Sequence, residues 1–425
     1  MPDRWQTYPL ELQGGLITNL SPLQHGLKAP GSARVLRNFE PSVEGGYRRI
    51  EGFNKYDSNI VPPYGAPVVH GASQTGTSLI IGNIHKTPEA GDTLTITGVT
   101  GTYTIATGGV TYDATNNRAT LTLTTSLASS PDNAAAVTFV TTTTSHLING
   151  IASWEDSVIV SRNDDLFRTT GSGYTHINVP NYGTVLVNGA SQTGTSFVVD
   201  GLSAAPQAGD VFKIAGVDLV YTVTSDASVS SGGATLAINP ALASSPADDA
   251  AITFLSTSRD GTVKVRSARY NFSGTEKIVF VDGANAPANY DTSTFTVLDA
   301  APSDAVGATH VVVFKNHLFF AKGTNLVFTA PFLESDFSSS SGGGTINSGN
   351  QITGLIVFRE QLIIFSERRI SRLTGNSLSD FQLQPITMDI GCTQTDTIQE
   401  VAGDIFFVGP DGIRSLGATE KIGDF

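Results

Sequence analysis

The hydrophobic residues of this chain come in short runs, separated by turns rich in Gly, Asn, Asp and Pro. Runs such as 79–81, 94–96 and 121–123 are brief or alternate with Ser and Thr. Hardly any stretch has the period of about 3.6 residues that marks an amphipathic helix. The pattern therefore predicts a protein built from short β-strands.

One phrase, GASQTGTS, occurs at 71–78 and again at 189–196. Without gaps, 17 of the 35 positions in 71–105 are identical to those in 189–223. After a slip of three residues the match resumes, with 121–139 over 236–254. The chain thus contains two copies of one module, and the short strands within each copy predict a small β-sandwich or barrel.

Outside the two copies the chain contains a second, weaker repeat, in which each unit is a series of short predicted strands. An apolar strand leads to a polar turn, then to a strongly apolar strand, a second turn and a third strand. The turns fall at 155–156, 315–316, 359–360 and 403–404. The stretches with this pattern are 148–170, 306–330, 352–375 and 398–417, and 276–291 fits it less completely.

Such small antiparallel meanders at regular spacing are typical of propeller blades, which avoid open sheet edges by radial repetition. An ordinary β-sandwich with similar turns is the alternative. We therefore predict an all-β fold, with a β-propeller-like body of antiparallel blades and two inserted small β-sandwich or barrel domains. The expected division is an N-terminal segment with the first propeller strands at 1–70, copy one at 71–139, a blade at 140–188, copy two at 189–254 and the remaining blades at 255–425.

Composition narrows the functional classes. The formal net charge is −13 and only 15% of residues are charged, which opposes a surface that holds a phosphate backbone through Lys and Arg clusters. The single cysteine, Cys392, cannot form an internal disulfide. No run has the roughly 18–20 apolar residues of a membrane span, and the first residues lack the apolar centre of a signal peptide. We expect a soluble protein made in a cytoplasm.

The sequence carries no recognisable catalytic or metal-binding motif. No two of the seven histidines stand at metal-ligand spacing on one element, and the sequence contains no zinc Cys cluster, Walker A loop or G-x-S-x-G elbow. The stretch 162–165, RNDD, offers oxygen atoms, but its spacing favours ordinary Asx turns over a calcium loop. The string nearest to a sialidase Asp-box, SRDGTV at 258–263, has the wrong spacing and no Trp. We expect no enzyme activity, no cofactor and no metal; a propeller enzyme acting on surface polysaccharide is a further hypothesis.

A cluster of basic residues is the only candidate site. SERRISR, at 366–372, places Arg368, Arg369 and Arg372 beside one turn. They either form a solvated face next to Glu367 or face a neighbouring subunit or a passing phosphate as channel or inter-subunit contacts.

Two stretches resemble a known family. The segment 10–57, with NFEP at 38–41 and GGYRRIEGF at 45–53, is similar to the start of tail proteins of short-tailed bacteriophages. The segment 354–416, with GC at 391–392 and FVGPDGI at 407–413, resembles podovirus tail nozzle or tail hub proteins. The two inserted copies are not part of this shared frame. The chain ends at GATEKIGDF, 417–425, where the family continues, so we expect the propeller to close with N-terminal strands or the chain to be a fragment or shortened form.

The resemblance implies a structural nozzle or hub that forms a ring, a hexamer, in the virion tail, closes the tail channel and conducts DNA at ejection. Its implied partners are further copies of itself, the tail adaptor and portal proteins, tail fibre or needle and knob proteins, and DNA in passing. The alternative is a receptor- or carbohydrate-binding tail component that uses the inserted domains. Sugar sites usually stack a ring on an aromatic side chain, but Tyr103, Tyr221, Phe139 and Phe254 occupy matched positions in the two copies, which favours a role in the core.

Overall fold

The computed structural model describes residues 39–41, 47–49, 59–142, 147–259, 262–298 and 305–422. The chain divides into two compact units, Met1–Tyr56 and Asp57–Phe425. In the first unit, β1 (Phe39–Pro41) and β2 (Tyr47–Arg49) form an antiparallel hairpin in which Glu40 lies opposite Arg48. Most of segment 10–57, which carries half of the family resemblance, lies outside the described residues.

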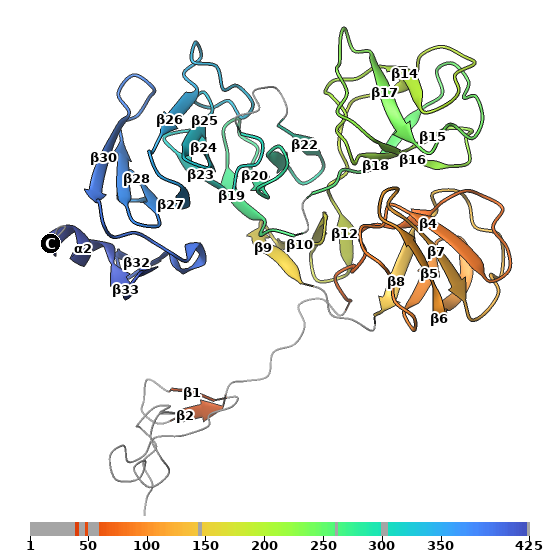
Figure 1. The fold of residues 1–425 in the computed structure, drawn as a ribbon, viewed down its shortest axis with the longest axis horizontal. Coiled ribbons are helices and arrows are strands. Elements are labelled where there is room, and N and C mark those ends of the chain that lie inside the picture. The colour runs from red at the N-terminus through yellow and green to blue at the C-terminus, as the bar shows by residue number, and fades with distance from the viewer. Residues whose placement is uncertain are drawn as a thin grey trace, which may run out of the picture. The chain divides into compact units, whose positions relative to one another are not determined.

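The described part of the second unit is built almost entirely of antiparallel sheets, which confirms the predicted fold class. Five of its sheets follow one another in chain order along an arc (Figure 1). We call them blades one to five. They are β9 (Ile148–Trp154), β10 (Ser157–Arg162), β11 (Asp165–Thr169) and β12 (Tyr174–His176); β19 (Arg266–Tyr270), β20 (Lys277–Val281), β21 (Ala288–Tyr290) and β22 (Phe295–Val297); β23 (His310–Phe314), β24 (His317–Lys322), β25 (Asn325–Phe328) and β26 (Gly344–Asn347); β27 (Ile352–Phe358), β28 (Gln361–Ser366), β29 (Ile370–Thr374) and β30 (Gln382–Thr387); and the three-stranded β31 (Gln399–Val401), β32 (Asp404–Gly409) and β33 (Gly412–Ser415). A 3-10 turn, η1 (Thr395–Thr397), precedes β31, and helix α2 (Leu416–Ile422) follows β33.

Each pair of consecutive blades shares its own apolar core. Side chains of a strand alternate between its two faces, and in β28 Leu362 and Ile364 pack towards blade three while Ile363 and Phe365 pack towards blade five. Strands β20 and β24 are divided between two cores in the same way. This arrangement explains why the second strand of each blade reads as a continuous apolar run, since both of its faces are covered.

The first hairpin of most blades turns on two residues. Lys315 and Asn316, at φ 49° and 64°, join β23 to β24, and Arg359 and Glu360, at φ 47° and 63°, join β27 to β28. Positive φ at both central residues matches the right-handed twist of the flanking strands. In blade five the turn lies at Ala402 and Gly403, one residue before the predicted 403–404.

The two sequence repeats fold into two matching domains, called barrel one and barrel two. Their sheets have the same strand order, β3-β4-β7-β6-β5-β8 and β13-β14-β17-β16-β15-β18. The strands are β3 (Val68–Val69), β4 (Ser78–Gly82), β5 (Thr93–Ile96), β6 (Val99–Asp113), β7 (Arg118–Leu123) and β8 (Val137–Thr141) in barrel one, and β13 (Leu186–Val187), β14 (Ser196–Asp200), β15 (Val211–Ile214), β16 (Val220–Val223), β17 (Ala234–Asn239) and β18 (Ile252–Ser256) in barrel two.

Each of these sheets curls round until its two edges meet. In barrel one the amide of Val69 donates to the carbonyl of Ala135 over 2.9 Å, and in barrel two the amide of Val187 donates to the carbonyl of Ala250 over 3.0 Å. Both edge strands, β3 and β13, lie before the repeat boundaries at 71 and 189. Curling leaves few open edges for pairing with other chains.

The doubled phrase GASQTGTS forms a loop that a glutamine side chain fills. Gln74 Nε2 donates to the carbonyls of His70, Gly71 and Ile80 over 2.9, 3.0 and 3.0 Å, and Gln74 Oε1 accepts the amide of Ile80. Gln192 makes the same four bonds in barrel two, to residues Asn188, Gly189 and Val198. These bonds account for the glutamine that the two copies share.

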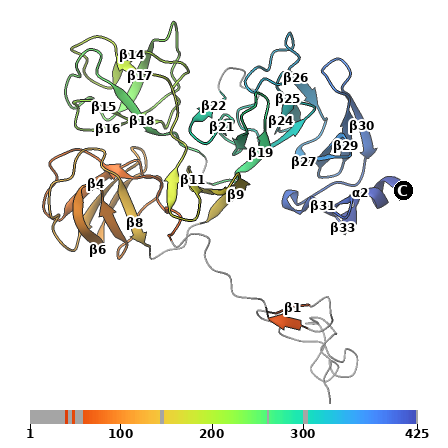
Figure 2. The same cartoon turned by 180° about the vertical axis from the view of Figure 1, so that it is seen from behind.

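The barrels lie side by side next to blade one in both ribbon views (Figures 1 and 2). Barrel two lies in the chain between blades one and two, and barrel one precedes blade one. Aromatic pairs close the base of each barrel: Tyr64 packs edge-on against Phe139 at 4.6 Å, and Tyr182 against Phe254 at 4.8 Å. These two tyrosines also lie before the repeat boundaries, so the folded module is larger than the repeat.

Candidate functional sites

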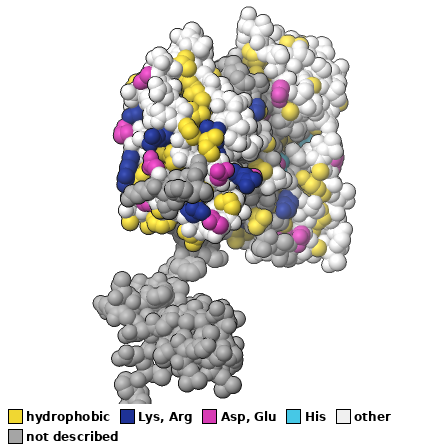
Figure 3. All heavy atoms as spheres, turned by 60° about the vertical axis from the view of Figure 1, so that its left-hand side comes forward, with side chains coloured by type: hydrophobic (Ala, Val, Ile, Leu, Met, Phe, Trp, Pro, Cys, Tyr) yellow, Lys and Arg dark blue, Asp and Glu magenta, His cyan; other side chains and the backbone are white. Residues whose placement is uncertain are grey.

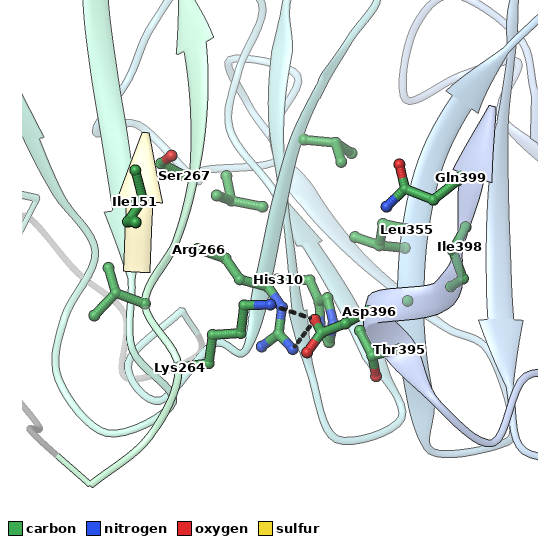
Figure 4. A pocket seen from close by; sticks show the side chains of 14 residues that line it. Ile151, Lys264, Arg266, Ser267, His310, Leu355, Thr395, Asp396, Ile398 and Gln399 are labelled. Atoms are coloured by element: carbon green, nitrogen blue, oxygen red, sulfur yellow. Dashed lines mark hydrogen bonds and ion pairs between the residues drawn. The ribbon is translucent and has the colours of Figure 1, made fainter. Parts of the chain in front are cut away.

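A cavity of about 390 Å³ lies among the first strands of blades one to four and the turn η1 (Figure 4). Polar side chains gather on one side of it, with Lys264 and Arg266 facing Asp396 and His310. Ile151 lies on one flank of the cavity, and Leu355 and Ile398 lie on the opposite flank. Contributions come from segments far apart in the sequence, so the cavity exists only when the blades are assembled.

One carboxylate oxygen joins the two cations of this cavity. Asp396 Oδ1 accepts a bond from Lys264 Nζ at 2.8 Å and one from Arg266 Nη2 at 3.2 Å. The hydrogen bond from Lys264, followed by the nearby charge of Arg266, holds the pKa of Asp396 below its usual range. Two positive charges facing one negative charge leave this side of the cavity with an excess positive charge.

His310 lies at the edge of the same cavity with only 8% of its surface exposed. Burial, with the positive charge of Arg266 next in weight, lowers the pKa of His310 to about 3, so its imidazole is neutral near pH 7. Its Nδ1 lies 2.9 Å from Thr309 Oγ1. Its buried Nε2 has no hydrogen-bond partner among the described residues.

A second group of contacts joins the two barrels. Val68 of barrel one packs with Val211 and Val220 of barrel two, and Asn133 Nδ2 donates to the carbonyl of Val217 over 3.4 Å. Barrel one has Thr93 and Thr102 at the positions that match the two valines 211 and 220. Thr102 is exposed whereas Val220 is buried. The apolar contact is therefore specific to this one pairing of barrels.

A buried carboxylate marks the junction of barrel one, barrel two and blade one. Asp165 at the start of β11 accepts a bond from His85 Nδ1 at 3.0 Å and one from His176 Nε2 at 2.7 Å. His85 Nε2 lies 3.4 Å from Ser258 Oγ, just after barrel two. Nearby, Ser256 Oγ bonds to Asn83 Oδ1 at 2.5 Å. One acidic group thereby connects three parts of the unit.

The pKa values of both partners are shifted by this geometry. Burial by itself would raise the pKa of Asp165, but the charge of His85 and the bonds from both histidines hold it well below its usual range. Burial likewise opposes the charged form of His85, yet Asp165 raises the pKa of His85 above its usual value. The junction is therefore held by an ion pair that forms at the expense of hydration.

The sequence alone does not identify this junction. Asp165 belongs to RNDD, 162–165, whose spacing predicts ordinary turn residues. In the structure Asn163 does occupy a turn, at φ 54°, while Asp165 begins a strand with its side chain fully buried. An acidic residue at the first position of an apolar strand is the signal that the sequence offers, and nothing in the sequence identifies its partners.

The predicted basic cluster lies on the outer part of blade four. Arg372 on β29 forms an ion pair with Glu420 of α2 at 3.2 Å and donates from Nε to Gln384 at 3.3 Å. Arg368 is exposed in the turn between β28 and β29, and Arg369 beside it is half-buried. None of the three lines the central cavity. Their predicted role as channel or inter-subunit contacts stays a prediction.

Within the described ranges, no three His, Cys, Asp or Glu side chains are arranged to hold a metal ion. No helix there is long and apolar enough to cross a membrane. Cys392 is a buried free cysteine. His310 and His317, which flank β23 and its turn, are both buried.

Comparison with known proteins gives one family match. Residues 181–256, which are barrel two, match the model of the B domain of the distal tail protein pb9. The matched range begins at residue 181, next to Tyr182, which packs against Phe254 at the base of barrel two. The family model therefore covers the whole folded domain and not only the sequence repeat. The match supports a structural protein of a phage tail, acting in the virion tail.

No curated protein sequence matches the chain. Among solved structures, apo AztD from Citrobacter koseri is similar over 83% of this chain and 92% of its own, at 10% identity and a TM-score of 0.31. The endosialidase of phage phi92 is similar over 82% of this chain and 62% of its own, at 11% identity and a TM-score of 0.27. Scores this low transfer no activity to this chain.

Proposed function

We propose that the chain is the nozzle or hub subunit of a short phage tail, and that it forms a ring, a hexamer, which closes the tail channel and conducts DNA at ejection. The match of residues 181–256 to a distal tail protein domain is the observation that carries this proposal. The same fold is present twice, because barrel one repeats the strand order of barrel two.

The way in which the barrels are fixed supports a structural role. A buried ion pair, His85 with Asp165, and an apolar contact around Val211 and Val220 hold them against blade one and each other. Buried polar and apolar contacts together fix one relative orientation, as a ring subunit needs in order to meet its neighbours in register.

The charge of the molecule suits a channel that DNA passes through. Several arginines are already paired within the chain, among them Arg259 with Asp282, Arg372 with Glu420 and Arg414 with Asp411. On the face shown in Figure 3 basic and acidic side chains are interspersed. The chain as a whole has a formal net charge of −13, and a protein with so few unpaired cations releases few counterions from DNA and so would not retain it.

The alternative, carbohydrate binding by the barrels, finds less support in their aromatic residues. Tyr103 and Phe139 of barrel one are 3% and 5% exposed, and Tyr221 and Phe254 of barrel two are 0% and 7% exposed. Rings buried to this extent cannot stack on a sugar. The matched aromatic positions belong to the barrel cores, as the sequence comparison indicated.

The test is assembly. The full chain, alone and mixed with the tail adaptor and portal proteins of its phage, is measured by mass photometry and imaged by electron microscopy. Rings of the chain, placed at the distal end of the tail in virions, are expected. A strictly monomeric species in the presence of adaptor would overturn the ring. Complete virions without the chain that fail only in adsorption would favour the receptor-binding alternative.

A further inference from the structure

We propose that blade five packs against segment 10–57 of the same chain, which supplies the next blade of the propeller between blade five and blade one. Three features of the molecule point to this contact: an uncovered apolar face on blade five, an exposed apolar residue on blade one, and a buried cation where the chain arrives from this segment. The contact does not depend on the proposed tail function. Residues 39–41 and 47–49 of the segment form an antiparallel hairpin, and antiparallel hairpins are the units of every blade.

One face of blade five is apolar and uncovered. In β32 the side chains of Ile405 and Phe407 pack against blade four, so the alternate residues Phe406 and Val408 point away from it. The register of the neighbouring strands places Val401 and Ile413 on that same side. We call this side the end face; it consists of Val401, Phe406, Val408 and Ile413. Three of the four side chains are exposed, Val401 at 51%, Phe406 at 38% and Ile413 at 79%.

The equivalent face of blade four shows what covers such a surface. Its residues Ile363 and Phe365 are only 2% and 0% exposed, because blade five packs on them. A contiguous exposed apolar face on a folded protein usually marks a contact surface. The contact between consecutive blades, repeated once more, covers the end face. Its partner is therefore expected to be another small β-meander.

Blade one forms the other end of the arc. Ile151 of β9 lies opposite Val160 in the sheet and is 71% exposed, although it is a large apolar residue. It borders the same cavity as Ile398 and Gln399, which lead into blade five (Figure 4). The two ends of the arc thus approach each other around this cavity, and one further blade between them can contact both.

The chain arrives from segment 10–57 at blade one. Arg162 Nη1 donates to the carbonyl of Val61, and Asn163 Nδ2 donates to the carbonyl of Pro63. These bonds fix residues 61–63 against the end of β10. An extended chain spans at most about 3.6 Å per residue, so residue 57 lies within about 14 Å of Val61. The end of the segment is therefore held close to blade one.

Arg162 also provides charge complementarity. It is 7% exposed, and its Nε is buried without a hydrogen-bond partner among the described residues. Burial lowers the pKa of Arg162, and no carboxylate of the described residues opposes this effect. A buried cation without an anion is costly. Glu51 and Asp57, which precede Val61 in the sequence, are the acidic residues of the segment closest to it along the chain.

The test is photo-crosslinking of the full chain. Ile413→p-benzoylphenylalanine places a photoreactive group on the end face, and Leu333→p-benzoylphenylalanine, at a 48% exposed position of blade three, is the matched control. The first variant is expected to cross-link to 10–57 within one chain, so that the product runs as a monomer on a denaturing gel, and the control is expected not to. Cross-links between two chains, which would place a second copy on the end face, would overturn the proposal. Cross-links only to other segments, none at all, or equal cross-linking by the control would overturn it as well.

A charge on the end face gives a second measurement. Ile413→Asp should speed trypsin cleavage after Arg48 and Arg49 of β2 by about tenfold or more, because a carboxylate there opposes burial of the end face and frees the segment. Leu333→Asp is the matched control and should leave the cleavage rate unchanged. Since Ile413 is 79% exposed within the described residues, the substitution should not unfold blade five itself, and the urea midpoint checks this. Equal cleavage rates of the native chain and Ile413→Asp contradict the contact.

Discussion

Asp165 of blade one and His85 of barrel one form an ion pair of 3.0 Å in which both side chains are fully buried. Gly65 lies so close that a Cβ placed on it would meet Asp165 Oδ2 at 2.3 Å, and its φ of +86° also favours glycine. The chain leading into barrel one thus passes directly over the pair. The junction depends on a carboxylate that has replaced its hydration with protein partners.

Replacing the carboxylate tests this junction. Asp165→Asn should lower the free energy of unfolding by about 3 kcal/mol, the usual cost of breaking a buried pair. Asp132→Asn, at an exposed aspartate of barrel one, is the control and should change it by less than about 0.5 kcal/mol. Urea unfolding at pH 5.5, followed by fluorescence, measures both. An equal effect of the two substitutions would mean that the pair does not stabilise the junction.

The same pair predicts a pH window. The pKa of His85 is raised from 6.5, so its contribution is complete below that pH and is lost as the pH rises through the folded-state pKa. The pKa of Asp165 is lowered from 3.8, so its contribution is complete above that pH and is lost on further acidification. The difference in stability between the native chain and Asp165→Asn should be largest between pH 3.8 and 6.5 and should shrink above it. A difference that grows towards pH 9 would contradict the assignment.

The glutamine of the repeated phrase GASQTGTS can be tested independently in both barrels, at Gln74 and at Gln192. Gln74→Ala removes a side chain that satisfies three carbonyls and one amide, and should cost about 2 kcal/mol. Gln192→Ala should cost a similar amount in barrel two. Thr77→Ala, in the same loop but exposed, is the control. Hydrogen exchange read by mass spectrometry should show faster exchange at residue 80 or 198 in the matching variant alone.

The sequence predicts the features that depend on neighbouring residues in the chain, such as the positions of strands and turns. Alternation and turn residues mark nearly every strand, and the repeat identifies the barrels, because a barrel folds from contiguous residues. The partners of Asp165 could not be predicted, since His85 is 80 positions away and the pairing depends on how barrel one meets blade one. The cavity among the first strands of the blades could not be predicted for the same reason, because Lys264 and Asp396 come together only when the blades are assembled.

Divergence between the two copies predicts which face joins them. Val220→Thr places on barrel two the residue that barrel one has at position 102, and should destabilise the barrel contact by about 1–2 kcal/mol because a hydroxyl enters an apolar contact. The reciprocal Thr102→Val changes an exposed side chain and should be close to neutral. Differential scanning calorimetry of both variants decides. Equal effects would show that the face around Val220 contributes no more than the free face.

A second buried ion pair permits a full thermodynamic cycle. Arg259, just after barrel two, donates from Nε to Asp282 Oδ2 at 2.7 Å, with side-chain exposures of 2% and 0%. Its Nη1 also bonds to the carbonyl of Ala286 at 2.9 Å. Burial would raise the pKa of Asp282, but the guanidinium holds it below its usual range, so the carboxylate stays charged.

Arg259→Met removes the partner and leaves that carboxylate buried, which should cost about 3–5 kcal/mol. Asp282→Asn should also destabilise, and the double variant should cost less than the sum of the two, because neither charge is then left alone. Urea unfolding of the four proteins gives the coupling energy. Additive effects would show that the pair, although close, is not coupled; a coupling of about 1 kcal/mol or more confirms that barrel two is anchored to blade two through these two charges.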